Sequence, residues 1–233
     1  MPSQGEHNFD EYYLRQIGVV TPLSGKEQTE QNQPPATQAG EADSALSSSD
    51  LESLKAEALA CTACELSETR TQVVFGVGDP HADIVFIGEA PGREEDIKGE
   101  PFVGRAGKLL DSMLRALGFD RSQIYIMNVI KCRPPDNRDP KPAEVAACSR
   151  WFDAQWQSIE PKMICLLGRI AAQRVLETDA PLSSLRGRWS EYRGVPVWVT
   201  YHPAYLLRSP TQKAKVWDDL IQLKKRYKSL TSE

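Results

Sequence analysis

Short runs rich in Val and Ile alternate with amphipathic stretches along most of this sequence, and this alternation constrains the fold more than any other feature. The predicted strands cover residues 83–88, 123–129, 162–168 and 195–201. The predicted helices that separate or follow them cover residues 106–117, 142–159, 169–177 and 212–227. Because strands separated by helices form parallel sheets, the sequence predicts an α/β fold with helices on both faces of the sheet.

The folded domain is predicted to begin at residue 49. Residues 24–50 contain no aromatic and almost no large apolar side chain, so they cannot bury enough surface to offset the entropy lost on ordering. We therefore predict a disordered linker at residues 23–48. A helix is predicted from Ser49 to about Ala60, and residues 49–233 are assigned to one folded domain.

The first 22 residues carry a separate apolar pattern, because Phe9, Tyr13 and Ile17 recur every four residues. This spacing predicts one short amphipathic helix that ends at Gly18. Either this helix docks on a protein partner or on its own domain, or the pattern is an incidental apolar cluster. The sequence leaves these alternatives open.

Charge is distributed unevenly along this chain of net charge −4. Residues 1–50 hold two basic and eight acidic side chains, whereas residues 181–233 hold ten basic and four acidic ones. Because phosphate contacts need only local positive charge, nucleic acid is not excluded as a partner, although the late basic residues are alternatively a solvated helix face. The sequence has no apolar run of about 18 residues and no secretory signal, so we expect a cytoplasmic monomer without a membrane partner.

Five cysteines are present, and a reducing compartment argues against structural disulfides. Four of them form a Cys-x2-Cys pair at Cys61 and Cys64 and a Cys-x15-Cys pair at Cys132 and Cys148. Four thiolates hold zinc or an iron–sulfur cluster, and the spacing does not identify the metal. Cys165 lies inside an apolar run and is predicted to be buried and inert.

Ligands of parallel sheets bind at the carboxyl ends of the strands, so the loops after the predicted strands are the candidate sites. The loop from Gly88 to Asp96 lacks the Gly-Lys-Ser/Thr of a phosphate loop. Its glycines allow a ligand to approach the backbone, and its four acidic residues indicate a polar or metal site, or only a solvated turn. Phe102 follows on a loop that is expected to be exposed, where it is a candidate stacking platform.

Two further polar side chains follow predicted strands. Asn128 offers a donor and an acceptor to one planar ligand edge, although a lone Asn at a strand end is more often a turn residue. His202 lies where a parallel sheet places its ligand, and Leu206 and Leu207, beside Arg208, form an apolar tip suited to wedge into DNA. In the alternative reading, His202 caps a turn and the leucines pack under the helix.

Taken together, the segments GEAPGREED, PFVGRAG, NVIKCRPP and HPAYLLR and the two cysteine pairs resemble the iron–sulfur uracil-DNA glycosylases of bacteria and archaea, called type four. The resemblance runs from about Leu54 to Arg226 in the order and spacing of the family. It implies a three-layer α/β/α fold with a central four-stranded parallel sheet, and uracil-containing DNA, single- or double-stranded, across the strand ends. It also implies a structural [4Fe–4S] cluster on Cys61, Cys64, Cys132 and Cys148.

The resemblance also implies roles in a uracil pocket to which Gly88 belongs. Asn128 would bind O4 and N3–H of uracil together, which cytosine does not allow. Phe102 would stack on the flipped base, and Glu95 would block the 5-methyl group of thymine. His202 would donate to O2 as negative charge develops there.

The attacking water needs a group that orients it. Many members of the wider superfamily use an Asp in the first loop, whereas this chain has Ala90 at that position, in the uracil-binding set. The neighbouring Glu89 is the available carboxylate and is assigned to position or activate water, with the main-chain carbonyls of the loop as a competing answer. The candidate DNA contacts are Arg105, Leu206, Leu207 and Arg208.

The implied activity is hydrolysis of the bond between uracil and deoxyribose in DNA, which leaves an abasic site. A catalytically weak protein that recognises or covalently holds uracil in DNA is the alternative. Covalent binders of this superfamily carry a basic, His-containing insertion after the third cysteine, whereas residues 133–147 contain no histidine, which disfavours that alternative. Recruitment of a repair factor by residues 1–22 is a third hypothesis, compatible with catalysis.

Overall fold

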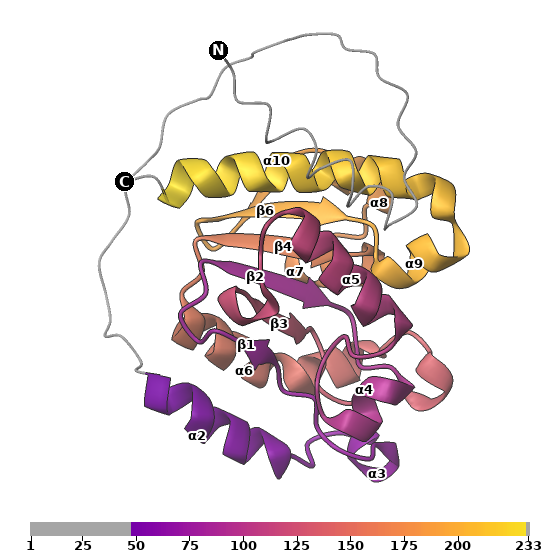
Figure 1. Ribbon diagram of the computed structural model, residues 1–233. Helices are drawn as coiled ribbons and strands as arrows, with labels where there is room; N and C mark the ends of the chain where they lie inside the picture. The colour runs from indigo at the N-terminus through magenta and orange to yellow at the C-terminus, as the bar shows by residue number, and fades with distance from the viewer. Residues whose placement is uncertain (1–47, 232–233) are drawn as a thin grey trace, which may run out of the picture.

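The computed structural model describes residues 48–231 of the chain (Figure 1). The docking helix predicted at residues 1–22 lies outside the described residues, as does the predicted linker apart from Ser48. Within residues 48–231, none of the helices has the length and apolar character needed to cross a membrane.

Four parallel strands form the centre of the sheet, in the order β3-β2-β4-β6. They are β2 (Ile84–Gly88), β3 (Tyr125–Asn128), β4 (Met163–Leu167) and β6 (Val195–Thr200). Each falls inside a strand predicted from the sequence. The four-stranded parallel centre of the predicted α/β/α fold is therefore confirmed.

Two short antiparallel strands extend the sheet to six strands, a feature that the sequence reading missed. β1 (Val77–Gly78) pairs with β3 and has only two residues, too few to show a periodic pattern. β5 (Trp189–Tyr192) pairs with β6 across a tight turn in which Arg193 and Gly194 both have positive φ, 50° and 81°. Its side chains are at least partly exposed, so it lacks the buried apolar run that marked the inner strands.

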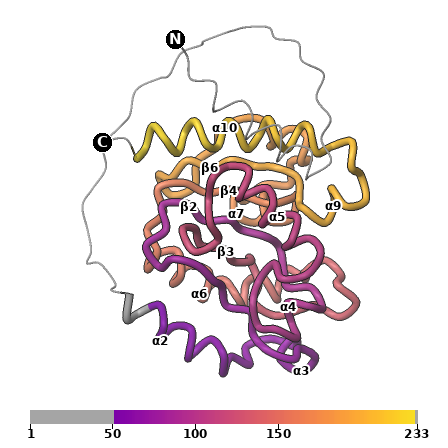
Figure 2. Tube along the Cα trace, in the orientation of Figure 1, coloured from indigo at the N-terminus to yellow at the C-terminus, as the bar shows by residue number. Residues whose placement is uncertain are grey.

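Helices cover both faces of the sheet (Figures 1 and 2). One face packs against α5 (Arg105–Ala116) and α10 (Lys213–Thr231). The other face packs against α2 (Ser48–Leu59), α6 (Pro142–Ile159), α7 (Arg169–Val175) and α8 (Leu182–Leu185), with the short α3 (Leu66–Thr69) beside them. Figure 2 shows α2 and α10 on opposite sides of the sheet, one in each outer layer.

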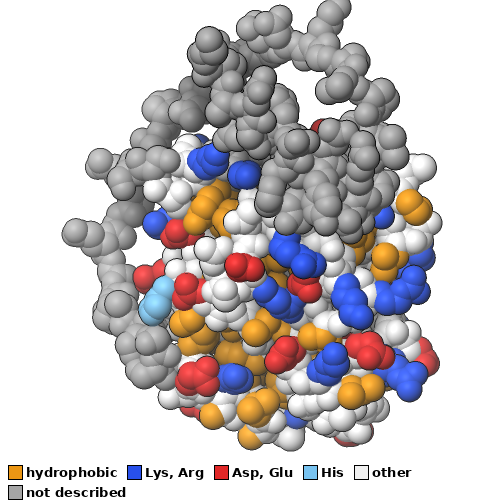
Figure 3. Space-filling view, viewed as in Figure 1, with side chains coloured by type: hydrophobic (Ala, Val, Ile, Leu, Met, Phe, Trp, Pro, Cys, Tyr) orange, Lys and Arg blue, Asp and Glu red, His pale blue; other side chains and the backbone are white. Residues whose placement is uncertain are grey.

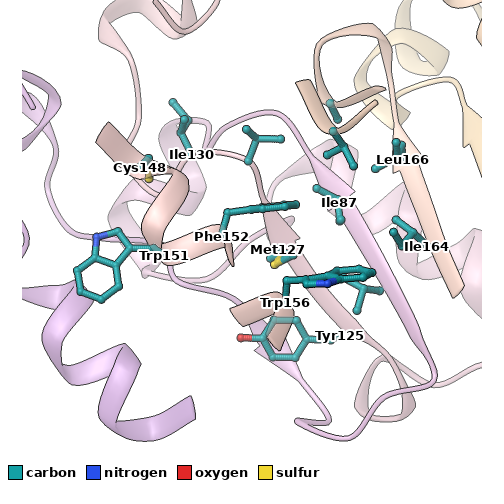
Figure 4. Close-up of a cluster of buried hydrophobic side chains, with 14 of the residues drawn as sticks. Ile87, Tyr125, Met127, Ile130, Cys148, Trp151, Phe152, Trp156, Ile164 and Leu166 are labelled. Atoms are coloured by element: carbon teal, nitrogen blue, oxygen red, sulfur yellow. The ribbon is translucent and has the colours of Figure 1, made fainter. Parts of the chain in front are cut away.

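Alternating side chains of each inner strand supply the two cores. Ile84 and Phe86 of β2 point to the α5 and α10 layer, whereas Val85 and Ile87 point to the α6 layer. In Figure 4, Phe152 and Trp156 of α6 lie over the sheet, with Cys148 of the same helix beyond them on the side away from Ile164. Helix α6 therefore links the core of the domain to the cysteines.

The carboxyl ends of the parallel strands meet at one edge of the sheet, toward which the strand arrows point in Figure 1. Gly88 at the end of β2 pairs with Asn128 at the end of β3. Two short helices follow strand ends there: α4 (Arg93–Lys98) after β2 and α9 (Pro203–Arg208) after β6. The remaining helical turns are the 3-10 turns η1 (Arg121–Gln123), η2 (Pro135–Asn137) and η3 (Pro210–Gln212).

Candidate active site

A pocket of about 440 Å³ opens at the carboxyl ends of the strands. Its walls come from the loops after β2, β3 and β6, which brings together residues far apart in the sequence. Of the site residues expected from the sequence, it is lined by Glu89, Ala90, Glu95, Phe102, Asn128, His202 and Arg208. The rule that ligands of parallel sheets bind at strand ends therefore locates this pocket.

Asn128 is buried in the pocket with its side-chain oxygen unpaired. Its side chain is 2% exposed, and its Oδ1 has no hydrogen-bond partner in the structure. A Cβ atom at Gly88 would lie 2.4 Å from that Oδ1 and 2.6 Å from Cζ of Phe102, so only glycine fits at Gly88. A buried polar atom without a partner is costly, so this oxygen is available to pair with a bound ligand.

The side chain of Lys131 holds the main chain of Asn128 in place. Nζ of Lys131 donates a hydrogen bond to the carbonyl oxygen of Asn128 at 2.8 Å, and the Lys131 side chain is only 1% exposed. A buried ammonium group that reaches this carbonyl fixes the end of β3. The carboxamide therefore projects from a backbone that is held in place.

His202 serves as a helix cap and lines the pocket at the same time. It is the N-cap residue of α9, and its Nδ1 accepts a hydrogen bond from the backbone N–H of Ala204 at 3.1 Å. Burial lowers the pKa of His202 to about 4; Arg208 acts in the same direction and Glu95 opposes it. The imidazole is therefore neutral near pH 7, and because Nδ1 accepts, its proton lies on Nε2.

Phe102 is buried rather than exposed as the sequence suggested. Its side chain is 6% exposed, and its ring centroid lies 5.5 Å from that of His202, with 31° between the ring planes. Its φ of 54° lies in the left-handed region, which is rare for a bulky residue. The ring faces the same pocket as Asn128, so it remains a candidate platform for a planar ligand.

Glu95 lines the pocket and also holds the loop that carries Phe102. Its Oε1 accepts hydrogen bonds from the backbone N–H groups of Val103 at 3.0 Å and Gly104 at 2.9 Å. From the sequence, Glu95 was expected only to block the 5-methyl group of thymine. The contacts by which Glu95 holds this loop cannot be predicted from a sequence motif, because they are made to backbone atoms.

Glu89 is a half-buried carboxylic acid at the pocket wall beside Ala90. Burial raises the pKa of Glu89 to about 7; Asp139 acts in the same direction and Arg169 opposes it. A group with this pKa accepts a proton readily near neutral pH. Glu89 therefore has the protonation behaviour of a general base.

The segment after Cys132 was overlooked as part of this site. Asn137, Arg138 and Asp139 also line the pocket. Arg138 is held by the buried Glu144, whose Oε2 accepts from Nη1 at 2.9 Å. The same strand-end rule that singled out Asn128 applies to this segment, since it follows β3.

The two leucines of α9 separate into different environments, which corrects part of the expected DNA surface. Leu206 is 1% exposed and packs in the core beneath α9, so it does not reach DNA in this structure. Leu207 is 38% exposed, and Arg208 and Arg105 are exposed as well. The packing alternative therefore holds for Leu206, and of the two leucines only Leu207 is exposed to solvent.

The four cysteines of the two sequence motifs, Cys61, Cys64, Cys132 and Cys148, line one small cavity between α2, α6 and the segment after β3. All are free thiols, and three of the sulfur atoms lie near N–H donors. Nη1 of Arg70 lies 3.1 Å from Sγ of Cys132, Nη2 of Arg150 lies 3.6 Å from Sγ of Cys61, and the backbone nitrogen of Lys131 lies 3.3 Å from Sγ of Cys148. Cationic donors around sulfur suit thiolates that carry negative charge.

No group of three or more His, Cys, Asp or Glu side chains within residues 48–231 is placed to hold one metal ion. Cys165 lies apart, fully buried in β4, and burial raises the pKa of its thiol. The prediction that Cys165 is a buried thiol is thereby confirmed.

Comparison with known proteins identifies the family. The model of the uracil DNA glycosylase superfamily matches residues 75–221. A type-4 uracil-DNA glycosylase of Archaeoglobus fulgidus is 44% identical over 179 residues, which cover 72% of this chain and 89% of that protein. One from Thermotoga maritima is 45% identical over 157 residues, 66% of this chain and 82% of that protein. The chain therefore belongs to the uracil-DNA glycosylase superfamily, among relatives of type 4.

Proposed function

We propose that this protein hydrolyses the N-glycosidic bond between uracil and deoxyribose in DNA, releasing uracil and leaving an abasic site. The observation that carries the proposal is the unpaired carboxamide of Asn128 in a pocket shared with His202 and Phe102. A planar base with hydrogen-bonding edges satisfies this set of groups. The type-4 relatives, named as uracil-DNA glycosylases, support the choice of uracil.

Asn128 discriminates between uracil and cytosine in this proposal. Its Oδ1 accepts from N3–H of uracil while its Nδ2–H donates to O4. Cytosine presents an acceptor at N3 and an amine at C4, which is the opposite pattern. The hydrogen bond from Lys131 fixes the main chain from which this carboxamide projects.

Phe102 stacks on the base after it leaves the DNA helix. Flipping costs roughly a few kcal/mol of lost stacking and pairing, which contacts inside the pocket must offset. Glu95 and the first loop close the side of the pocket that faces C5, where thymine carries its methyl group. Rejection of thymine is then steric.

His202 stabilises the leaving group. As the bond between C1′ and N1 breaks, its electron pair passes to N1 and is delocalised onto O2 of uracil. A donor placed at that oxygen lowers the barrier most when it is preorganised. Because Nδ1 of His202 is engaged by the N–H of Ala204, Nε2–H is the donor, and the imidazole acts while neutral.

Glu89 positions the attacking water. The water oxygen bonds to C1′, and its proton passes to the Glu89 carboxylate, from which it returns to solvent. The uracil anion takes a proton at N1 after release. The pKa of Glu89, raised to about 7 chiefly by burial, makes the carboxylate a stronger base than a solvent-exposed glutamate.

Positive charge near the pocket supports DNA as the substrate. In Figure 3, several Lys and Arg side chains gather on the right-hand side of the molecule, the side toward which the parallel strands point in Figure 1. Arg208 lines the pocket, and Arg105 is exposed at the start of α5. We propose that these arginines contact phosphates and that Leu207 fills the space left by the flipped base.

We further propose that Cys61, Cys64, Cys132 and Cys148 hold a [4Fe–4S] cluster. The shared cavity and the cationic N–H donors around the sulfur atoms fit a cluster whose thiolates carry negative charge. When bound, the cluster supplies a structural crosslink rather than redox chemistry. It ties α2 and α6 to the segment that begins at Asn128.

The function is tested with a labelled oligonucleotide that contains one uracil. Incubation with the protein followed by alkali should cut the strand at that position, and a matched oligonucleotide with thymine there should remain intact. Absence of scission would reject the proposal. Retarded migration of uracil-containing DNA without scission would favour the alternative of a uracil-DNA binding protein.

A further inference from the structure

The backbone around Phe102 is held in an uncommon conformation by two charged side chains, Glu95, which lines the pocket, and Arg121, which does not. Phe102 has φ of 54°, and its carbonyl presses against the first turns of α5. A Cβ atom at Gly107 would lie 1.8 Å from that carbonyl oxygen, so only glycine allows this approach. A bulky residue keeps such a conformation only where its surroundings fix it.

Arg121 contacts the carbonyl side of this loop. Its Nη1 donates to the carbonyl oxygen of Phe102 at 3.1 Å, and its Nη2 donates to the carbonyl oxygen of Pro101. The same Nη1 lies 2.8 Å from Oδ1 of Asp111 on α5, which orients the guanidinium. The planar fork of arginine suits two adjacent carbonyls, a geometry that lysine does not provide.

Glu95 contacts the amide side of the same loop. It accepts from the N–H groups of Val103 and Gly104, while Arg121 donates to the carbonyls of Pro101 and Phe102. Four consecutive residues are thus fixed between an anion and a cation. The Phe102 ring is thereby held next to Gly88 and His202.

We propose that Arg121, oriented by Asp111, is a positioning residue that holds Phe102 in the conformation that stacks on uracil. The proposal rests on the proposed function, because uracil is the ligand that Phe102 meets. Without Arg121, the Phe102 backbone relaxes toward negative φ and the ring leaves its place beside His202. Arg121 itself does not touch the base.

A double-mutant cycle in the full-length protein tests this proposal. The variants are Arg121→Met, Phe102→Ala and the combination, measured as kcat/KM for release of uracil from single-stranded DNA. We expect Arg121→Met to lower kcat/KM roughly tenfold to a hundredfold, the range for misplaced binding groups. In the Phe102→Ala background the same change should cost less than about twofold, because the residue through which Arg121 acts is gone.

Two further variants separate positioning from charge and from folding. Arg121→Lys keeps the charge but not the fork, so it should lose nearly as much activity as Arg121→Met. Arg193→Met removes a comparable surface ion pair, with Asp153, that is far from the loop, and should leave kcat/KM unchanged. Thermal melting of all variants shows whether a loss of activity reflects unfolding.

The outcomes distinguish this proposal from the proposed function. If the unmodified protein releases no uracil, the proposed function fails. If the unmodified protein is active but Arg121→Met costs the same in both backgrounds, the positioning role is overturned. Full activity of Arg121→Lys would also overturn it, because charge alone would then account for the effect.

Discussion

The pocket and the cysteine cavity are joined by a short stretch of chain, residues 129–131, yet the atoms that each site offers to its proposed ligand differ in their hydrogen bonds. In the pocket, Oδ1 of Asn128 is buried without a partner. In the cavity, N–H donors of Arg70, Arg150 and Lys131 lie near the sulfur atoms of three of the four cysteines. An oxygen without a partner is available to a ligand that binds and dissociates, whereas sulfur atoms with donors nearby suit a group that stays bound.

This contrast separates activity from stability. Substitution of Asn128 in the pocket should slow the reaction with little change in thermal stability, because no group of the fold pairs with its Oδ1. Substitutions in the cysteine cavity should lower stability together with activity.

The largest effect is expected for Asn128→Ala and His202→Ala. Each removes a group aimed at the uracil ring, and the single-turnover rate of uracil release should fall roughly 10²- to 10³-fold. Asn128→Ala should not lower the melting temperature by more than a few degrees, since an unpaired buried carboxamide contributes little to stability. Near-normal release by either variant would remove that residue from the mechanism.

The next largest effect on the rate of uracil release is expected for Glu89, whose ionisation should make that rate depend on pH. The pKa of Glu89 is raised to about 7, and its ionised form accepts the proton, so the single-turnover rate should rise with pH up to about 7 and then level off. His202, with a pKa of about 4, should add no second inflection between about pH 5 and 9. Glu89→Gln should lower the rate roughly 10²-fold and flatten the profile.

Asp139→Asn provides the control for this pH profile. The Asp139 carboxylate helps to raise the pKa of Glu89, so its removal should move the inflection to lower pH. A Glu89→Gln variant that keeps the inflection of the unmodified protein would show that another group titrates. Main-chain carbonyls of the first loop would then be the remaining candidates for positioning water.

The third prediction tests the cavity. Cys148→Ala should lose bound iron, melt at a lower temperature and release uracil roughly 10- to 100-fold more slowly, the range for altered metal shells. Cys165→Ala is the matched control, because Cys165 is also buried but lies outside the cavity. It should keep its iron content. Iron content in Cys148→Ala equal to that of the unmodified protein would reject the proposed cluster ligands.

The sequence predicts the centre of the fold better than its edges for a physical reason. The inner strands are buried on both faces, so they appear as continuous apolar runs whose identity does not depend on neighbours. Strand β5 is half-exposed and is defined by its pairing with β6, which no local pattern reveals. Helix α9 has six residues, too few for a periodic signal.

In the site, too, some residues can be predicted from the sequence and others cannot. Asn128 ends β3 and His202 follows β6, so topology alone points to them. Arg121 contacts the carbonyls of Pro101 and Phe102 from about twenty residues away, and any donor of suitable length would look the same in the sequence. Contacts from side chains to distant backbone atoms depend on the folded loop geometry, and that geometry is not encoded in a motif.

The smallest effect on rate is expected at α9. Its two neighbouring leucines should differ in the same way, since the exposed one should affect activity and the buried one stability. Leu207 is 38% exposed, so it has only part of its surface left to bury against DNA. Burying a whole leucine contributes roughly 1.5–3 kcal/mol, and a tenfold rate change corresponds to about 1.4 kcal/mol. Leu207→Ala should therefore slow uracil release less than about tenfold on duplex DNA, and less on single strands, which have no stacked partner to replace.

Leu206→Ala should behave in the opposite way. Leu206 is 1% exposed in the core, so its truncation should lower the free energy of unfolding by roughly 2–5 kcal/mol. The folded fraction should keep a release rate near that of the unmodified protein, with equal losses on duplex and single strands. A duplex-specific rate loss in Leu206→Ala without loss of stability would mean that α9 rearranges on DNA and presents Leu206 as the wedge.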